Sequence, residues 1–245
     1  MIKNTLYGAL FCAAIAFFAV SPMTVNAQDQ MNEDNPAIDR SAIPDSGDSV
    51  NDFVPKGWKL EADVKGDLNG DGIADHALKL VEDKPAESDG TMTDRNRALV
   101  LVFADKDGVL TKAAVTDKLL QCTSCGGAFY GVSDAPAEVT IEKGVLVVNQ
   151  DHGSRWVTDV TFRFRFDEQP NMFILIGFDY AGRDRATGEV STESTNYLTG
   201  KRITTIGKGK RETTKTTVVK KMRYSIEEAS AENFEAEATT RLGLD

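Results

Sequence analysis

Hydrophobic and polar residues alternate with a period of two over most of the chain that follows its polar N-terminal part. The clearest example is "RWVTDVTFRFRFD", in which alternate residues form an apolar face: Trp156, Val160, Phe162, Phe164 and Phe166. Such alternation is typical of a β-strand that covers a core with one face and meets water with the other. We therefore predict a strand here. A second, more apolar strand, "MFILIGFDY", is expected after the turn "DEQPN".

Short apolar segments separated by turn residues continue this pattern in both directions. Three further pairs of strands are predicted in "RALVLVFADKDGVLTKAAV", "AEVTIEKGVLVVNQD" and "STESTNYLTGKRITTI", around Asp107-Gly108, Lys143-Gly144 and Thr199-Gly200. The spacing leaves no room for crossover helices. The predicted fold class is all-β, a mostly antiparallel meander of hairpins that forms a curved sheet, a sandwich or a partial propeller.

The C-terminal part of the pattern is highly charged. Residues 201–223 are basic, with Glu212 as their only acid, and "TTKTTVVKKM" favours an extended edge strand whose charges discourage pairing with other chains. Ser225 followed by Glu228 forms a capping-box pattern, which predicts a short acidic helix through about Thr239. We interpret the two charged segments, residues 201–223 and 223–245, as a solvated surface and a frayed tail, and a dedicated binding arm is the alternative.

The first 27 residues have the layout of an export signal. Lys3 precedes the apolar run "ALFCAAIAFFAV", and the small residues around Ala27 fit the cleavage rule. We expect a mature chain that begins at Gln28, in the periplasm or secreted, with no transmembrane segment after cleavage. An uncleaved membrane anchor is the alternative.

Three parts are expected in the mature chain. Residues 28–52 are polar, acidic and free of aromatic residues before Phe53, so we predict a flexible tether that buries too little apolar area to offset its ordering entropy. Residues 53–222 form the β-rich domain, and the acidic helix follows. The formal net charge of −10 disfavours nucleic acid as a partner and suits cation binding.

The stretch "GDLNGDGIADHAL" concentrates oxygen ligands within one short loop, residues 67–75. Alternate positions of this loop offer the side chains or the carbonyl that a hard cation prefers: Asp67, Asn69, Asp71, Ile73 (carbonyl) and Asp75. Calcium takes about six to eight such oxygens, and Gly72 permits the sharp bend that brings them together. We predict a Ca²⁺ site. The alternative is a turn rich in Asp, Asn and Gly that binds nothing.

The same residues form the pattern D-x-[DN]-x-D-G-x-x-D, which resembles the calcium loop of FG-GAP and VCBS repeats. The resemblance covers roughly residues 57–81, without a second full copy in the sequence, so it implies one blade-like hairpin instead of a complete propeller. The wider arrangement "GWKL…GDLNGDGIAD…LVLVF…CxxCGG…NYLTGK" resembles a group of exported bacterial proteins of unknown function. That likeness implies a β-rich fold and an exported location, but no activity.

Cys122 and Cys125 are the only cysteines that follow the signal. In an oxidising compartment such a pair is expected to close a small structural disulfide ring. A redox pair is one alternative, but a glycine pair follows instead of a good helix start. A zinc site is another, and only His76 and His152 are histidines that could complete it.

Two further sets of residues have both a functional and a structural interpretation. Asp151, His152 and Ser154 could suggest a hydrolase, but neighbours on a hairpin seldom face one another, so we predict a turn. Aromatic residues near the turns could line a groove, but core packing is the interpretation we favour for Tyr130, Trp156, Tyr180 and Tyr197.

The resulting hypothesis is a non-enzymatic exported protein, stabilised by one calcium ion and one disulfide. It would present a sheet face or loop rim to an envelope or extracellular partner. One alternative is an envelope thiol–disulfide protein that uses the cysteine pair. Another is a carbohydrate-active or hydrolytic enzyme, which would need a cleft with two convergent carboxylates.

Overall fold

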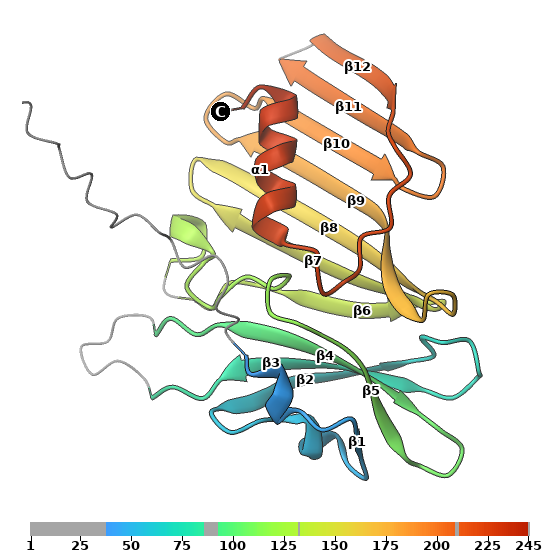
Figure 1. The fold of residues 1–245 in the computed structure, drawn as a ribbon. Coiled ribbons are helices and arrows are strands. Elements are labelled where there is room, and N and C mark those ends of the chain that lie inside the picture. Colours follow the sequence, from blue (N-terminus) through green and yellow to red (C-terminus); the bar gives the residue numbers. More distant parts are fainter. Residues whose placement is uncertain (1–37, 86–92, 132, 209–210, 245) are drawn as a thin grey trace, which may run out of the picture. The chain divides into compact units, whose positions relative to one another are not determined.

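Two antiparallel sheets and one C-terminal helix make up the part of the chain that the structure, a computed structural model, describes (Figure 1). The described residues are 38–85, 93–131, 133–208 and 211–244. The predicted signal peptide and residues 28–37 of the predicted tether lie outside them. The expectation of a mostly antiparallel all-β fold with a short C-terminal helix is confirmed.

The first sheet, here called the N-terminal sheet, has five strands in the order β1-β5-β4-β3-β2. Its strands are β1 (Ser46–Gly47), β2 (Trp58–Gly66), β3 (Asp75–Glu82), β4 (Arg97–Ala104) and β5 (Leu110–Thr116). The four longer strands follow one another as hairpins, as the alternating apolar segments predicted. Gly108, in the predicted β4–β5 turn, has a φ of 83°, a conformation that L side chains rarely adopt.

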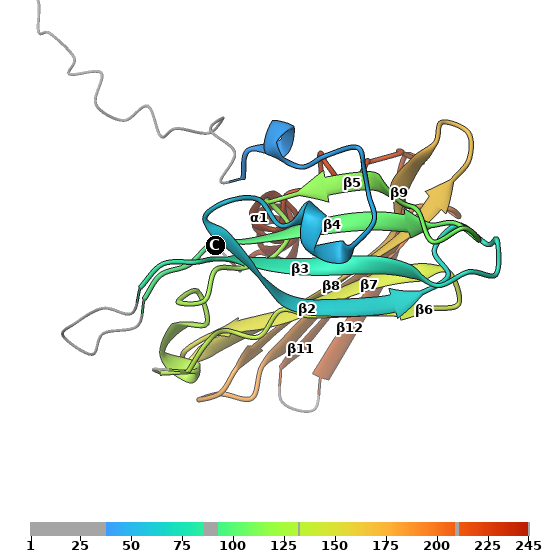
Figure 2. The same ribbon diagram turned by 90° about the horizontal axis from the view of Figure 1, so that it is seen from below.

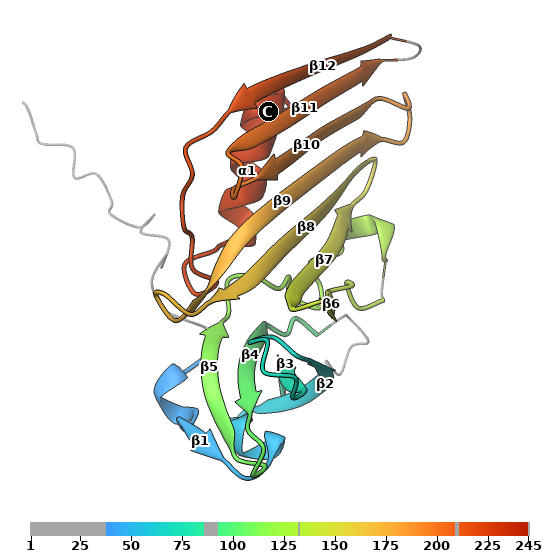
Figure 3. The same cartoon turned by 90° about the vertical axis from the view of Figure 1, so that its right-hand side faces the viewer.

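The second sheet, here called the C-terminal sheet, is an uninterrupted meander of seven strands (Figure 3). Its strands are β6 (Glu138–Glu142), β7 (Val145–Gly153), β8 (Trp156–Asp167), β9 (Met172–Asp184), β10 (Val190–Asn196), β11 (Lys201–Lys208) and β12 (Arg211–Val218). The predicted turns at Lys143-Gly144 and Thr199-Gly200 join β6 to β7 and β10 to β11. β12 is the edge strand, as predicted from its charges.

The N-terminal sheet is buried on both faces. Ala77, Leu99 and Leu101 belong to one hydrophobic cluster together with Phe162 and other residues of the C-terminal sheet. Tyr180 and Tyr197 are also buried in this cluster, which confirms their interpretation as core residues. Residues on the opposite face form a second cluster, which includes Leu78, Leu80, Val100 and Val102.

The segment that covers the second cluster corrects one prediction. Residues 38–52 were expected to be a flexible tether, but they form the 3-10 helices η1 (Arg40–Ala42) and η2 (Val50–Phe53) with β1 between them (Figure 2). Ile38, Ile43 and Phe53 are almost fully buried against the N-terminal sheet. The tether prediction is therefore wrong for this part, because a few apolar side chains suffice where a sheet offers them a second core face.

The start of the C-terminal helix also differs from the prediction. Ser225 and Glu228 do exchange the two hydrogen bonds of a capping box, each 3.3 Å long. These bonds close a turn and do not start a helix. The reason is that Ser225 forms a β-bridge with Ile174 of β9, which holds it in an extended conformation. Helix α1 (Ala231–Leu242) begins later, where the Ser230 hydroxyl accepts a hydrogen bond from the Asn233 N–H.

Helix α1 packs across the C-terminal sheet (Figure 1). The Phe234 ring lies 5.7 Å from that of Phe162, 5.3 Å from that of Phe178 and 5.3 Å from that of Tyr224. The interpretation of residues 223–245 as a solvated tail is therefore wrong for α1, whose apolar face is part of the core. Among the described residues, no helix combines the length and apolar character needed to cross a membrane.

Candidate functional site

The loop between β2 and β3 contains most of the predicted calcium ligands. Asp67 accepts hydrogen bonds from the N–H groups of Gly70, at 2.6 Å, and of Gly72, at 2.9 Å. Both glycines have a φ of 86°, so the prediction of a sharp positive-φ bend is confirmed. The Asn69 side chain accepts from the Asp71 N–H at 2.9 Å, and Asp71 accepts from the Ile73 N–H at 2.8 Å. These contacts wind the loop around its own carboxylates.

Asp75, the last predicted ligand, has a different environment. It is fully buried, and one carboxylate oxygen accepts from the N–H groups of Leu68, at 2.8 Å, and Asn69, at 3.3 Å. The other oxygen accepts from the Ala104 N–H of β4 at 3.0 Å. Burial raises the pKa of Asp75, although these hydrogen bonds act in the opposite direction. Asp75 therefore fastens the loop to the neighbouring strand.

The loop fits a calcium ion in part. Asp71 is exposed and Asp67 is half-buried on the same turn, close to Asn69 and Ile73. Asp75 already accepts three hydrogen bonds of the roughly four that a carboxylate can take. Among the described residues, no group of three acidic, histidine or cysteine side chains is placed to hold a metal. The calcium site remains a prediction.

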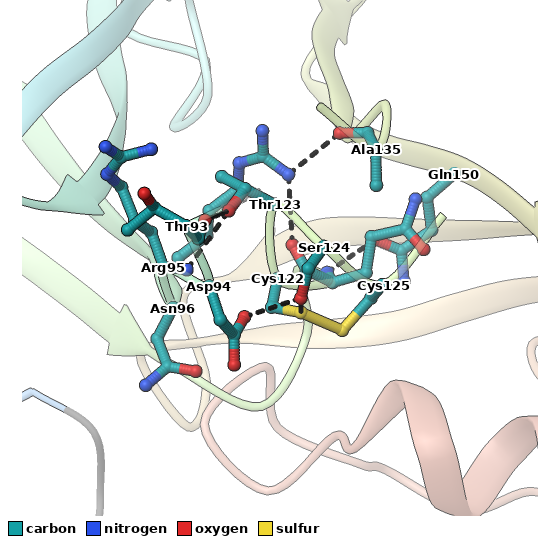
Figure 4. Close-up of a disulfide and its surroundings, with 12 residues drawn as sticks. Thr93, Asp94, Arg95, Asn96, Cys122, Thr123, Ser124, Cys125, Ala135 and Gln150 are labelled. Carbon is teal, nitrogen blue, oxygen red and sulfur yellow. Dashed lines mark hydrogen bonds between the residues drawn. A yellow bond between two sulfur atoms is a disulfide. The ribbon is translucent and has the colours of Figure 1, made fainter. Parts of the chain in front are cut away.

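The cysteine pair lies in the loop that precedes β6 (Figure 4). The sulfur atoms of Cys122 and Cys125 are 2.07 Å apart, at disulfide distance, as predicted. Thr123 between them is buried; its hydroxyl donates to the Thr93 carbonyl at 2.9 Å and accepts from the Arg95 N–H at 3.0 Å. The disulfide loop is therefore anchored to the segment that leads into β4.

The surroundings of the disulfide bear on its chemistry. Cys125 is exposed and Cys122 is half-buried, so a small thiol could approach the bond. The residues that follow form only η3 (Gly127–Phe129), a 3-10 helix of three residues, in agreement with the predicted poor helix start. A thiolate here would therefore have no α-helix N-terminus to stabilise it.

Asp151, His152 and Ser154 do not converge. The Tyr130 hydroxyl donates a hydrogen bond to Asp151, and burial is the main cause that raises the pKa of Tyr130 to about 12. His152 hydrogen-bonds through Nε2 to Glu235 of α1 at 2.9 Å. Ser154 lies exposed in the β7–β8 turn. Asp151 and His152 belong to β7 and pair with Asp159 and Thr158 of β8, so the prediction of a turn is wrong for these two residues and correct only for Ser154. The interpretation of His152 as a hydrogen-bonded structural residue agrees with these contacts.

The His152–Glu235 contact predicts a pH-dependent link between β7 and α1. Its hydrogen bond raises the pKa of His152 above the ordinary value of 6.5. The link should therefore be complete below about pH 6.5 and be lost as the pH rises through the raised pKa. We expect His152→Gln to lower the free energy of unfolding by about 1 kcal/mol near pH 6 and by less near pH 9. Urea denaturation at both pH values measures the difference in free energy of unfolding between wild type and variant. Glu235→Gln should remove the same pH dependence. A difference that is equal at pH 6 and pH 9 would contradict the prediction.

Three ion pairs, each with one member that is at most 2% exposed, were not anticipated from the sequence. Glu193 of β10 pairs with Arg241 of α1 and Arg202 of β11. Arg97 of β4, which is 2% exposed, pairs with Glu61 of β2. A signal for the first pair was present, because strict alternation in "VSTESTN" puts Glu193 on the inward face of its strand.

The edge of the C-terminal sheet is the most exposed regular element among the described residues. Seven of the eight residues of β12 are exposed, and its only neighbouring strand there is β11. Arg211 and Lys215 form no ion pair with any described residue. This edge, β12 with its two free cations, is here called the basic edge.

Comparison of the chain with protein-family models, with curated proteins and with solved structures finds no match. The resemblance of the β2–β3 loop to FG-GAP and VCBS repeats therefore remains a prediction.

Proposed function

We propose that this chain is an exported β-domain that binds an acidic, extended segment of an envelope or extracellular protein at the basic edge. The observation that carries this proposal is the exposure of β12 on both faces and along one edge. Such a strand buries little apolar area of its own. Its unpaired N–H and C=O groups are a template to which a partner segment can add as a further strand.

Charge identifies the kind of segment. Arg211 and Lys215 lie on β12 and Lys220 follows it, all three exposed, whereas the chain as a whole has a net charge of −10. An acidic partner would be attracted to this local excess of positive charge. A second copy of the chain is disfavoured, because antiparallel pairing of two β12 strands would bring Arg211 and Lys215 of both copies close together.

The test is affinity capture from an envelope fraction with the full mature chain as bait. We expect a protein that the wild-type chain captures to be lost with Arg211→Glu/Lys215→Glu. The matched control is Lys56→Glu/Lys106→Glu, which changes the net charge equally at two exposed lysines far from β12 in the sequence. Capture that survives in the β12 variant, or that is lost equally in both, would sink the proposal.

An exported location is supported by the cysteine pair. A disulfide persists in oxidising compartments and is rare where thiols are kept reduced. The sulfur atoms of Cys122 and Cys125, at 2.07 Å from each other, agree with such a compartment. The predicted signal peptide at residues 1–27 points in the same direction.

Calcium is proposed to stabilise the β2–β3 loop. Binding to the native state should raise the free energy of unfolding by about 2.7 kcal/mol when calcium exceeds its Kd about a hundredfold. For a chain of this size that corresponds to an increase in Tm of about 5–10 °C, measured by thermal melting with calcium and with chelator. Asp67→Ala/Asp71→Ala should abolish the increase. The control is Asp105→Ala, in the turn after β4, which resembles the β2–β3 loop but has no acid at the position that corresponds to Asp75; this variant should retain the increase in Tm. If the wild type melts at the same temperature with and without calcium, the calcium proposal is wrong.

A thiol–disulfide function is the second candidate, favoured by the exposure of Cys125. The structural role predicts that Cys122→Ser/Cys125→Ser unfolds about 2 kcal/mol more easily and still captures its partner. It also predicts that the wild-type chain does not accelerate the reduction of insulin by dithiothreitol. Acceleration by the wild type that disappears in the double variant would favour the redox candidate.

A further inference from the structure

The C-terminal sheet divides at the start of β9. Residues 177–183 of β9 pair with β10, which ends at Asn196. The earlier part of β9 pairs instead with the segment before α1: Leu175 N–H donates to the Tyr224 carbonyl and Ile226 N–H donates to the Phe173 carbonyl, both at 2.9 Å. Figure 3 shows the connection from β12 to α1 passing beside this part of β9. A pocket of about 340 Å³ lies where the end of β10 separates from the segment before α1, the two neighbours of β9.

Three cationic residues and one acidic residue, Asp167, line this pocket. Arg165 of β8 and Lys221 line it, are both exposed, and form no ion pair or hydrogen bond with any described residue. Arg223 also lines the pocket, but it is paired with Asp167 at 3.5 Å and donates to the Gln169 carbonyl at 3.0 Å. The pocket therefore has two positive charges without a counter-ion, in a chain whose net charge is −10.

Apolar residues also line the pocket. Ile174 and Leu175 are buried at its wall, whereas Leu198 and Met222 are 41% and 42% exposed. A pocket lined by apolar side chains together with a few charged groups is the usual composition of a small-molecule site. Arg165 adds a planar guanidinium, which can donate two parallel hydrogen bonds to a carboxylate or a phosphate.

From this juxtaposition we propose that the pocket binds a small amphipathic anion, in which a carboxylate or phosphate head meets Arg165 and Lys221 and a short hydrocarbon chain covers Leu198 and Met222. The pocket lies apart from Arg211 and Lys215, so this inference does not depend on partner binding at the basic edge. Its ligand could be a free amphiphile or the head and upper chain of a membrane lipid.

Titration calorimetry with the full mature chain tests the proposal. Octyl phosphate and octanoate are the anionic probes, and octan-1-ol is the neutral probe of similar apolar length. We expect both anions to bind, and Arg165→Gln/Lys221→Gln to weaken their binding about tenfold or more. The matched control, Lys56→Gln/Lys106→Gln, removes two exposed charges elsewhere and should bind as the wild type does. All four positions are exposed, so neither variant should unfold.

Vesicles distinguish the two sources of the ligand. Co-sedimentation with phosphatidylglycerol vesicles, lost in Arg165→Gln/Lys221→Gln, would identify a lipid; binding of the free probes alone would identify a soluble amphiphile. Either result supports the pocket. The proposal is overturned if no anionic probe or vesicle binds, if octan-1-ol binds as tightly as octyl phosphate, or if the control variant loses binding equally.

Discussion

Replacing Glu193 by alanine is expected to lower the free energy of unfolding by about 3–5 kcal/mol, because it leaves two arginines without their buried partner. Glu193 is 1% exposed. Its carboxylate accepts from Arg241 Nη2 at 2.7 Å and Nε at 2.8 Å, and Arg202 Nε lies 3.2 Å away. These contacts tie α1 to β10 and β11, so the loss should also weaken the attachment of the helix.

The control for this prediction uses the same arginine. Glu237 pairs with Arg241 at 2.9 Å on the surface of α1, where its side chain is 66% exposed. Glu237→Ala is therefore expected to change the free energy of unfolding by less than about 0.5 kcal/mol. Urea denaturation of the two variants compares the pairs. Equal losses in both variants, or no loss in Glu193→Ala, would contradict the assignment of Glu193 as the main anchor of α1.

Replacing Arg97 by alanine is expected to lower the free energy of unfolding by about 2–4 kcal/mol, mainly because it leaves two carbonyl groups without their donor. Arg97 donates two hydrogen bonds of 2.9 Å to Glu61 of β2. Its remaining terminal nitrogen donates to the carbonyl groups of Gln121, at 3.2 Å, and Ala135, at 2.9 Å. Among the described residues, the substitution would leave Glu61 with Lys79 alone as a cationic partner, at 3.5 Å. It would also remove a donor from two carbonyl groups in the connection between the two sheets.

Arg95 is the matched control for Arg97. It precedes β4 in the same segment, but within the described part of the chain its guanidinium donates only to the Lys84 carbonyl, at 3.1 and 3.3 Å, near the surface. Arg95→Ala should therefore cost no more than about 1 kcal/mol. Chemical denaturation followed by tryptophan fluorescence measures both variants. If Arg97→Ala unfolds at the same denaturant concentration as Arg95→Ala, the proposed role of the buried guanidinium is wrong.

Local information was sufficient for the strands and most of their turns. The face alternation around Phe162 and Phe164 has a period of two, which only an extended chain can place against one core. Glycine at positions such as Gly72 and Gly108 marks a backbone conformation that other residues adopt only with strain. The alternation of faces and the turn glycines both depend on residues a few positions apart. They can therefore be recognised without knowledge of the rest of the fold.

The two ends of the domain show where local information failed. Residues 38–52 are polar in composition, yet Ile38 and Ile43 are buried because the N-terminal sheet has a second apolar face that needs covering. Ser225 has the sequence of a helix cap, yet a bridge to Ile174 of β9 delays the helix until Ser230. In both cases a distant strand decided the outcome.

For the candidate site, the sequence by itself determined the composition and curvature of the β2–β3 loop and the spacing that lets Cys122 and Cys125 approach each other. Only the tertiary structure decided that the Asp75 carboxylate would accept hydrogen bonds from backbone N–H groups, one of them from Ala104 of β4. It also decided that Glu193 would meet Arg241, and that Arg165 and Lys221 would share one pocket. The physical reason is the same throughout: a buried or clustered charge is defined by its partner, and Ala104, Arg241 and Lys221 are brought to Asp75, Glu193 and Arg165 from distant parts of the chain.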